Sequence, residues 1–456
     1  MEEPTRKHSL KVSFIDGCFA SIMIGFTANY ATPFALVLGA KNFHIGLLNA
    51  IPQLSSAFGQ LPAGDLAERV RSRVRFITYG VMGQALLWLV IGSIPYLIKE
   101  NQTSWFIILL TLTTISGAIV GPAWSSLMSD TVDKTQYGTY FAWRGRIHGF
   151  IALISNLIAG VWLYKMAEDK YLAFAILFCF AGLCRIASGV FLNKMTDVPL
   201  EIPLDKRFNY LDFIRRLPES NFAKFTLFVA FLNLAVFIAA PFFAVYMLRN
   251  LGFSYTEYAL VNTAGALASL LSLPLWGKIA DRYGNVKILR ATALFTPLLT
   301  LSWIVTDNLP YLIITNAFAG YIWAGFNLCA VNFIFDAASP PVRTRCLGYF
   351  NFTNGIAIFI GSITGGYMVN YLPPLRLLLG QHIIISNLLT LFFISGFLRM
   401  VIVLIGLNSF KEVRTADTIE EHKLLSIILG FKPMIDLGQN IFFRTHNPKQ
   451  DRSAEL

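Results

Sequence analysis

An all-α membrane protein with twelve transmembrane helices, in two six-helix repeats, is the fold class that this sequence predicts. Three observations carry the prediction. Hydrophobic residues make up 55% of the 456 residues and charged residues only 14%, whereas soluble domains carry about 25% charged residues. Long apolar stretches recur along the chain, and basic residues gather in alternate loops between them. A bilayer can solvate the apolar surface that this chain is too poor in polar residues to cover.

The apolar stretches define the helices in order. A spanning helix needs about 20 apolar residues to cross about 30 Å of hydrocarbon. Short polar turns, or turns with Pro or Gly, separate most of the stretches. The predicted spans are 12–38, 43–64, 76–98, 104–128, 141–165, 171–193, 222–248, 255–276, 287–306, 309–335, 345–371 and 381–408.

The loops between these spans predict the orientation. One set is rich in Lys and Arg, as at 69–75 and 278–290, and the alternate set is poor in them. Positive charge marks the cytoplasmic side, so both termini are expected in the cytoplasm, in a bacterial inner (plasma) membrane. Topology and anionic lipid explain the net charge of +11, and no nucleic-acid partner is needed.

The longest internal loop divides the chain. We predict an N-terminal six-helix bundle over 1–194, a cytoplasmic linker over 195–221, a C-terminal bundle over 222–408 and a cytoplasmic tail over 409–456. No cleavable signal peptide is evident, because the first apolar run is longer than a signal sequence needs. An apolar stretch at 424–443 predicts either a segment on the membrane surface or a partly disordered tail.

The two halves repeat one another in sequence. Identities recur at nearly constant offsets of 208 to 214 residues and in the same helix order, which indicates an internal duplication typical of secondary transporters. Such pairs include Asn49 with Asn262, Gly64 with Gly277, Arg69 with Arg282, Pro33 with Pro241, and Arg185 with Arg399.

A loop motif occurs in both halves. Residues 277–287 read GKIADRYGNVK, and residues 64–73 read GDLAERVRSR, with Glu68 and Arg71 in place of Asp and Gly. This motif resembles the Gly-x-(Leu/Ile)-Ala-Asp-Arg-x-Gly loop of the major facilitator superfamily. The resemblance covers about residues 10–410 and implies that superfamily's twelve-helix fold (the MFS fold) and a transporter that works by alternating access.

The resemblance also implies a cytoplasmic gate. Glycines of the motif would let helices approach closely, Arg69 or Arg73 would meet Asp130, and Arg282 would meet Asp336. Ordinary anchoring of charges at the membrane surface is the alternative. The predicted gating residues are Gly64, Glu68, Arg69, Arg73, Asp130, Gly277, Asp281, Arg282 and Asp336.

Uncharged polar residues lie deeper in the spans. By the resemblance, helices 1, 4, 7 and 10 line a substrate cavity, with contributions from 2, 5, 8 and 11. Bonding between helices, worth about 0.6 kcal/mol each, is the alternative. For the duplicated Asn49 and Asn262, a role in packing between helices is the favoured interpretation. The predicted cavity residues are Asn29, Tyr30, Gln53, Thr113, Asn156, Asn233, Trp323, Asn327 and Asn354.

Few ionisable residues lie inside the spans, where burial is costly unless they are paired. Asp16 is a candidate for proton coupling, or else a structural partner of Arg185. The duplication of Arg185 and Arg399 favours a shared structural role, and the resemblance implies that their helices lie outside the cavity. His148 and His382 lie near helix ends, where an interfacial role is expected.

Together these features predict a secondary active or facilitative transporter of a small, neutral or weakly charged organic solute. They predict neither an enzyme nor a cofactor or metal site, and no P-loop points to ATP. A proton or other ion and membrane lipid are the other expected partners of a monomer. The alternatives are a non-transporting sensor or scaffold on a transporter fold, and an integral membrane enzyme.

Overall fold

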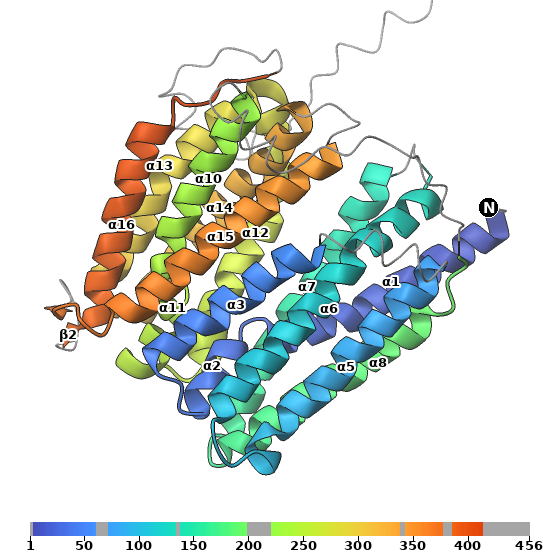
Figure 1. The fold of residues 1–456 in the computed structure, drawn as a ribbon, viewed down its shortest axis with the longest axis horizontal. Helices are drawn as coiled ribbons and strands as arrows, with labels where there is room; N and C mark the ends of the chain where they lie inside the picture. The colour runs from blue at the N-terminus through green and yellow to red at the C-terminus, as the bar shows by residue number, and fades with distance from the viewer. Residues whose placement is uncertain are drawn as a thin grey trace, which may run out of the picture.

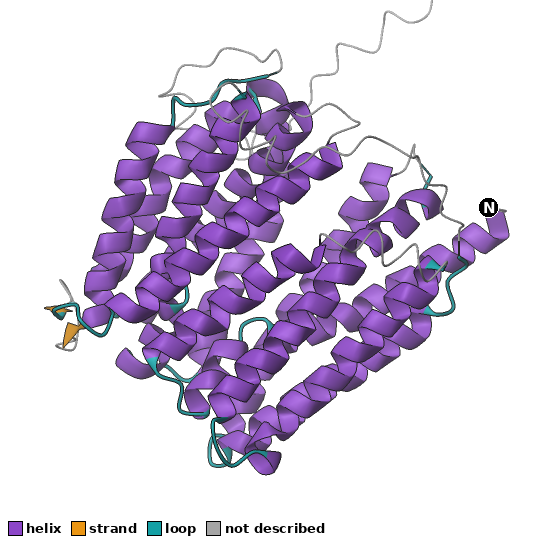
Figure 2. Cartoon of the chain, viewed as in Figure 1, coloured by secondary structure: helices purple, strands orange, loops and turns teal. Residues whose placement is uncertain are grey.

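Two bundles of long helices lie side by side in the computed structural model (Figure 1). The structure describes residues 3–60, 72–133, 137–197, 220–337, 343–376 and 385–413. Nearly all of these residues are helical (Figure 2). Ten of the described helical segments are long and apolar enough to span a membrane.

The twelve predicted spans are all present as helices. The first bundle contains α1 Glu3–Thr27, α2 Ala31–Val37, α3 Asn42–Gln60, α5 Arg73–Leu97, α6 Gln102–Thr131, α7 Tyr137–Lys165 and α8 Lys170–Leu192. The second contains α10 Asn221–Ala239, α11 Phe242–Val245, the π-helical turn η1 Tyr246–Asn250, α12 Tyr255–Tyr283, α13 Asn285–Leu301, the 3-10 turn η2 Ser302–Ile304, α14 Leu309–Ala337, α15 Arg343–Met368 and α16 Asn387–Gly406. The pair α1–α2 and the trio α10–α11–η1 each correspond to one predicted span.

The first span breaks into α1 and α2 just before Pro33. Proline has no N–H, so the carbonyl four residues earlier loses its helical partner. That carbonyl belongs to Asn29, and the hydroxyl of Tyr258 in the second bundle donates to it at 2.7 Å. The duplicated Pro241 lies at the corresponding break between α10 and α11. The break therefore frees a backbone acceptor that joins the two bundles.

Two predicted helix starts were wrong, and α12 ends at Tyr283 rather than near residue 276. The first helix starts at Glu3 rather than near residue 12, because its polar first turns are held by ion pairs of Lys7 with Glu3 at 2.8 Å and of Arg6 with Asp133 at 3.3 Å. The last helix starts at 387 rather than 381, where Ser386 caps it. Ahead of it, β2 Ile385–Ser386 pairs antiparallel with β1 Leu375–Arg376.

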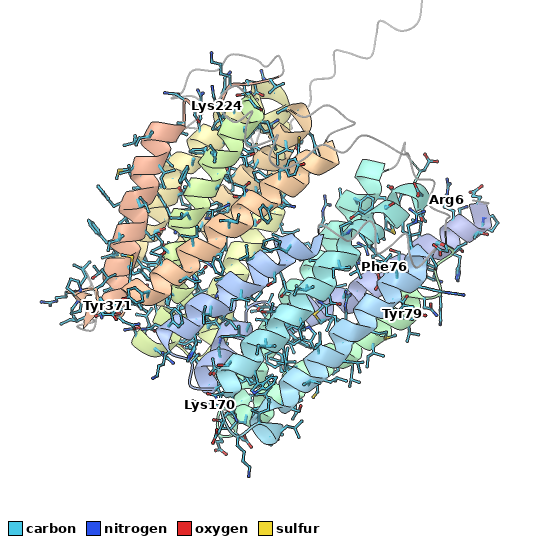
Figure 3. The ribbon with its side chains drawn as sticks, in the orientation of Figure 1. Arg6, Phe76, Tyr79, Lys170, Lys224 and Tyr371 are labelled. Atoms are coloured by element: carbon cyan, nitrogen blue, oxygen red, sulfur yellow. The ribbon has the colours of Figure 1, made fainter. Side chains whose placement is uncertain are left out.

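The two ends of the molecule differ in how the bundles meet. We call the end that carries the N-terminus the terminal end and the opposite one the distal end. Figure 3 shows Arg6 and Lys224 at the terminal end, and Lys170 and Tyr371 at the distal end. In Figure 1 the bundles are separated at the terminal end and come together beside α2, α3 and α11.

Hydrogen bonds that join the bundles gather toward the distal end. The Arg249 guanidinium donates to the Ala40 carbonyl at 2.7 Å, and Asn42 donates to Asn370 at 3.3 Å. Helix α3 packs along α15, and α7 packs along α12. At Gly160 the approach is so close that an added Cβ would lie 2.4 Å from that of Ala259. The distal end is therefore closed by direct helix contact.

At the terminal end, the chain after α16 packs into the second bundle. Phe410 is fully buried, with its ring 5.3 Å from that of Phe225. Glu412 accepts a hydrogen bond from the Val286 backbone N–H at 2.8 Å, at the start of α13. The packed part of this bundle thus extends past residue 408. The rest of the predicted tail, with the apolar stretch at 424–443, and most of the predicted linker lie outside the described residues.

Candidate functional site

A cavity of about 420 Å³ lies between the two bundles. The first bundle contributes Asn29 and Asn49 to its wall, and the second contributes Asn262, Asn316 and Trp323. Four of its polar side chains, those of Asn29, Asn49, Asn262 and Asn316, are carboxamides, which donate and accept hydrogen bonds without carrying charge. We call it the central cavity.

A second cavity of about 340 Å³ lies beside Asn29, between α1, α7 and α12. Asn29 donates to the side-chain oxygen of Asn156 at 3.0 Å, and Asn156 in turn donates to the Thr263 hydroxyl at 3.0 Å. This chain of side chains runs from the first bundle into the second. The side chains of Asn29 and Asn156 both line this second cavity, and Asn29 also lines the central cavity.

Several predicted cavity residues take other positions. Tyr30 is fully buried and donates to the Asn156 carbonyl at 2.6 Å, so it lies in a packed interface rather than on the cavity wall. Thr113 is 2% exposed and bonds back to the Leu110 carbonyl at 2.7 Å, so it packs inside the first bundle. Both side chains are packed against neighbours in this structure, because polarity alone does not tell which face of a helix meets a neighbour.

The other predicted polar residues are divided between packing and exposure. Asn233 in α10 donates to Asn354 in α15 at 2.6 Å, which joins two helices of the second bundle. Gln53 and Asn327 are exposed side chains. The duplicated Asn49 and Asn262 bond back to carbonyls one turn earlier, yet both also line the central cavity.

Sequence reasoning missed part of the cavity wall. Asn316 donates to the Val261 carbonyl at 2.7 Å and faces the cavity beside Gly265 and Gly320. Its signal is the pair of glycines, since an added Cβ at Gly320 would overlap the Gly265 backbone. Because the backbones of α12 and α14 are in such close contact, a side chain of ordinary length such as that of Asn316 extends to the cavity.

Arg399 also lines the central cavity, together with Leu299, Thr300 and Trp303. The expectation that this arginine lies outside the cavity was therefore wrong. Its helix, α16, packs against α10 and α13, and the long side chain reaches between them. The Arg399 guanidinium donates to the carbonyls of Val236 and Thr296, both at 3.2 Å.

Asp16 lies in a separate polar cluster inside the first bundle. Its side chain is 4% exposed and accepts a hydrogen bond from the Ser188 hydroxyl at 2.5 Å. Arg185 donates to Ser188 at 3.1 Å and to Gln84 at 2.8 Å. Asp16 and Arg185 are thus linked through a hydroxyl rather than by a direct ion pair.

The cluster borders a cavity of about 300 Å³, lined by Asp16, Arg185, Arg144 and His148 among others. The Arg144 guanidinium lies 4.7 Å from the centre of the Trp124 ring and donates to the Ser13 carbonyl at 3.1 Å. His148 is half-buried and is hydrogen-bonded to the Phe14 carbonyl at 3.2 Å. We call these residues the Asp16 cluster.

At the terminal end of the first bundle, one predicted gate contact is formed. Arg73 donates to Asp130 at 2.7 Å and to Ser126 at 2.8 Å. Arg73 is 3% exposed, and the Asp130 side chain is 47% exposed. Both belong to the first bundle, so this pair does not join the halves. Gly64, Glu68 and Arg69 lie outside the described residues.

The second bundle makes a related contact with a different donor. Asn285, the first residue of α13, donates to Asp336 at 2.7 Å. The Arg282 guanidinium lies 5.2 Å from the centre of the Tyr283 ring, and Asp281 lies beside it in the last turn of α12. An added Cβ at Gly277 would meet no atom of the described residues within 4 Å.

These features define a class of protein, namely a two-bundle helical membrane carrier with a cavity between its halves. The model of the Major Facilitator Superfamily matches residues 17–221 and 225–441. The chain therefore belongs to this superfamily and is a membrane transporter rather than an enzyme. The predicted family, fold class and transporter function are confirmed.

Two curated relatives match most of the chain. An uncharacterized MFS-type transporter of Methanocaldococcus jannaschii is 24% identical over 371 residues, which is 76% of this chain and 88% of the relative. The multidrug resistance protein MdtG of Enterobacter lignolyticus is 26% identical over 392 residues, which is 79% of this chain and 84% of the relative.

Solved structures show the same fold at low identity. The nucleoside transporter NupG aligns with a TM-score of 0.65 and 14% identity over 89% of this chain and 99% of its own. A bacterial homolog of the human lysosomal transporter Spinster, in an inward-facing and occupied conformation, aligns with a TM-score of 0.63 and 15% identity over 90% of this chain and 97% of its own.

Proposed function

We propose that this transporter moves a small, neutral or weakly charged organic solute by alternating access. One observation carries the proposal. The central cavity lies between the two bundles, which are in contact at the distal end and apart at the terminal end. A cavity between two bodies that are joined mainly at one end suits a carrier that exposes its site to each side in turn.

The halves 1–194 and 222–408 would move as two bodies, joined by the linker at 195–221, with the tail from 409 on the same side. The basic loops favour the terminal end as cytoplasmic and a bacterial inner membrane as the location. In that orientation the conformation is open to the cytoplasm. Membrane lipid would surround a monomer.

Transport by the purified protein tests the proposal. Full-length protein in proteoliposomes should move one or more solutes from a panel of organic compounds, with and without an imposed pH gradient. Because relatives carry the name multidrug resistance protein, apolar organic compounds belong in the panel. Binding without movement of any solute would favour the alternative, a non-transporting sensor or scaffold on this fold.

Reporter fusions test the orientation. Fusions after residues 101 and 307 should score as external, and fusions after 134 and 205 should score as internal, because basic loops are retained in the cytoplasm. Paired alkaline phosphatase and fluorescent protein reporters would give opposite signals at each site. A reversed pattern at two or more sites would refute this topology.

We propose that Arg73 with Asp130, and Asn285 with Asp336, hold the terminal ends of helices that meet when the cytoplasmic gate closes. Asp130→Asn removes the carboxylate to which the buried Arg73 donates at 2.7 Å. A partly exposed pair contributes about 1 kcal/mol, so turnover should fall about fivefold while the protein stays in the membrane. Asp133→Asn is the matched control, since its partner Arg6 lies at the surface. Equal turnover in wild type and Asp130→Asn would exclude the gating role.

Energy coupling is the remaining part of the proposal. Asp16 is a buried carboxylate beside a cavity in the first bundle, held by a hydroxyl and not by a direct ion pair. A carboxylate in that setting can change protonation as its surroundings open and close. We propose that a proton carried by Asp16 drives the solute.

A further inference from the structure

The Arg399 side chain is the charged group of the central cavity wall. Its hydrogen bonds within the protein do not use all of its N–H donors. It is 3% exposed, and its Nη atoms donate only to the neutral backbone carbonyls of Thr296 and Val236. Its Nε has no hydrogen-bond partner among the residues that the structure describes. A guanidinium has five N–H donors in a planar fork that matches a carboxylate. The site therefore has donor capacity left over.

No acidic side chain of the described residues forms an ion pair with Arg399. Burying a charge inside a protein is costly unless another charge or several hydrogen bonds compensate for it. Within a membrane, such residues normally face a partner or a water-filled path. Arg399 has the path, since it lines the central cavity, but it lacks the partner.

The duplicated arginine of the first bundle shows what a complete set of partners looks like. Arg185 donates to the side chains of Gln84 and Ser188, and Ser188 connects it to the carboxylate of Asp16. Arg185 therefore has side-chain partners within its own bundle, one of which bonds to a carboxylate.

The second bundle lacks each of these partners. At the offsets of 208, 213 and 214 residues, the counterparts of Asp16, Gln84 and Ser188 are Lys224, Pro297 and Ile402. Lys224 lies exposed at the terminal end (Figure 3). The arginine has been kept while its carboxylate, amide and hydroxyl have been replaced, so its counter-charge is left for a ligand to supply.

The surroundings of Arg399 suit an organic anion rather than an inorganic one. Trp303 and Phe243 line the same cavity, with their ring centres 4.8 Å apart. The remaining polar groups, such as Asn262 and Asn316, are uncharged. One guanidinium neutralises one negative charge, so a second charge on the ligand would remain uncompensated in a buried site.

From this arrangement we infer that Arg399 binds the single anionic group of the transported solute, and that the solute is a small organic carboxylate with an apolar body. The apolar body lies against Trp303 and Phe243. The carboxylate supplies the acceptors that Arg185 finds in its own bundle. This inference rests on the proposed transport function and narrows its weakly charged substrate to a monoanion.

Matched acids and amides test the inference in the full-length protein. Benzoate, indole-3-acetate and octanoate would each be compared with the corresponding carboxamide by ligand-induced thermal shift in detergent. At least one acid should stabilise the wild type while its amide has little effect. Arg399→Gln should lower the affinity for that acid about tenfold to a hundredfold, and Arg399→Lys, which keeps the charge, should lose less.

A second pair of variants guards against a misfolded Arg399→Gln protein. The Thr300 hydroxyl and the Arg399 guanidinium both reach the Thr296 carbonyl. Thr300→Asp would therefore give Arg399 an internal carboxylate and should abolish acid binding. Thr300→Asn, of the same size but neutral, should retain it. Loss of acid binding in Thr300→Asp but not in Thr300→Asn would identify the added charge as the cause.

The outcomes separate this inference from the transport function. Equal stabilisation by acids and amides, no response to any of the acids, or unchanged acid affinity in Arg399→Gln would overturn the inference. Movement of amides by both wild type and Arg399→Gln would also overturn the inference, but it would leave the proposed transport function intact. Acid binding that requires Arg399, in a protein that moves no solute, would uphold the site and refute transport.

Discussion

Replacing Asp16 with Asn should abolish accumulation of solute driven by a pH gradient while leaving exchange of solute across the membrane intact. Asn keeps the size of the side chain and can still accept a hydrogen bond from Ser188. It cannot take up or release a proton. The variant therefore separates the proton-carrying role of Asp16 from its place in the hydrogen bonds of the first bundle.

The size of the effect follows from the driving force. One pH unit corresponds to about 1.4 kcal/mol, so one proton per solute can support accumulation of about tenfold. In Asp16→Asn the ratio of internal to external solute should fall to about 1, because the imposed gradient no longer does work on the solute. Proteoliposomes loaded and diluted at different pH values would measure it.

Glu257→Gln is the matched control, because it also converts a carboxylate to an amide of the same size. Glu257 caps the start of α12 near the distal end, where its side chain accepts from the Ser254 N–H at 2.8 Å. Its loss should leave accumulation nearly unchanged. If Asp16→Asn still accumulated solute to the wild-type level, Asp16 could not be the proton carrier.

The sequence was a good guide to the fold because hydropathy follows directly from the solvent. Each of the twelve spans had to be apolar for about 20 residues, and that pattern needs no tertiary information. The two wrong helix starts lie where this signal fails. The polar start of α1 is stabilised by ion pairs with Lys7 and Arg6, and the start of α16 is set by a short strand pair.

The site was harder to predict, because it depends on which face of each helix meets the cavity. Asn29 and Trp323 lie on the wall, whereas Tyr30 is turned into a packed interface. Arg399 was placed outside because the family's outer helices do not usually line the cavity. The length of the Arg399 side chain explains the difference, since a long side chain can pass between two helices to a space that its own backbone does not touch.

The duplicated sequence contained a signal for Arg399 that identities alone did not reveal. Repeated residues such as Arg185 and Arg399 suggest a shared role. The role differs because their neighbours are not repeated, as Lys224 in place of Asp16 shows. In a duplicated fold, a repeated charge whose partners have changed indicates a site that has diverged. Comparing the neighbours of each repeated residue is therefore more informative than counting the repeats.

Cross-linking the bundles at the distal end should stop transport completely and reversibly. Asn42 at the start of α3 donates to Asn370 beyond the end of α15 at 3.3 Å, so the two side chains meet across the bundle interface. Alternating access requires this interface to open. In the Asn42→Cys/Asn370→Cys variant, a short bifunctional methanethiosulfonate reagent should lock the distal end closed, and dithiothreitol should restore transport.

A cross-link within one bundle provides the control. Asn250 donates to Ser386 at 3.0 Å, also at the distal end but inside the second bundle. Cross-linking Asn250→Cys/Ser386→Cys should leave transport nearly unaffected, because bodies that move as units keep their internal contacts. The native thiols, such as Cys18 and Cys329, lie within the helices and are present in every variant. Full transport by a completely cross-linked 42/370 protein would show that the solute crosses without separation of the bundles at this end, and it would refute alternating access about this interface.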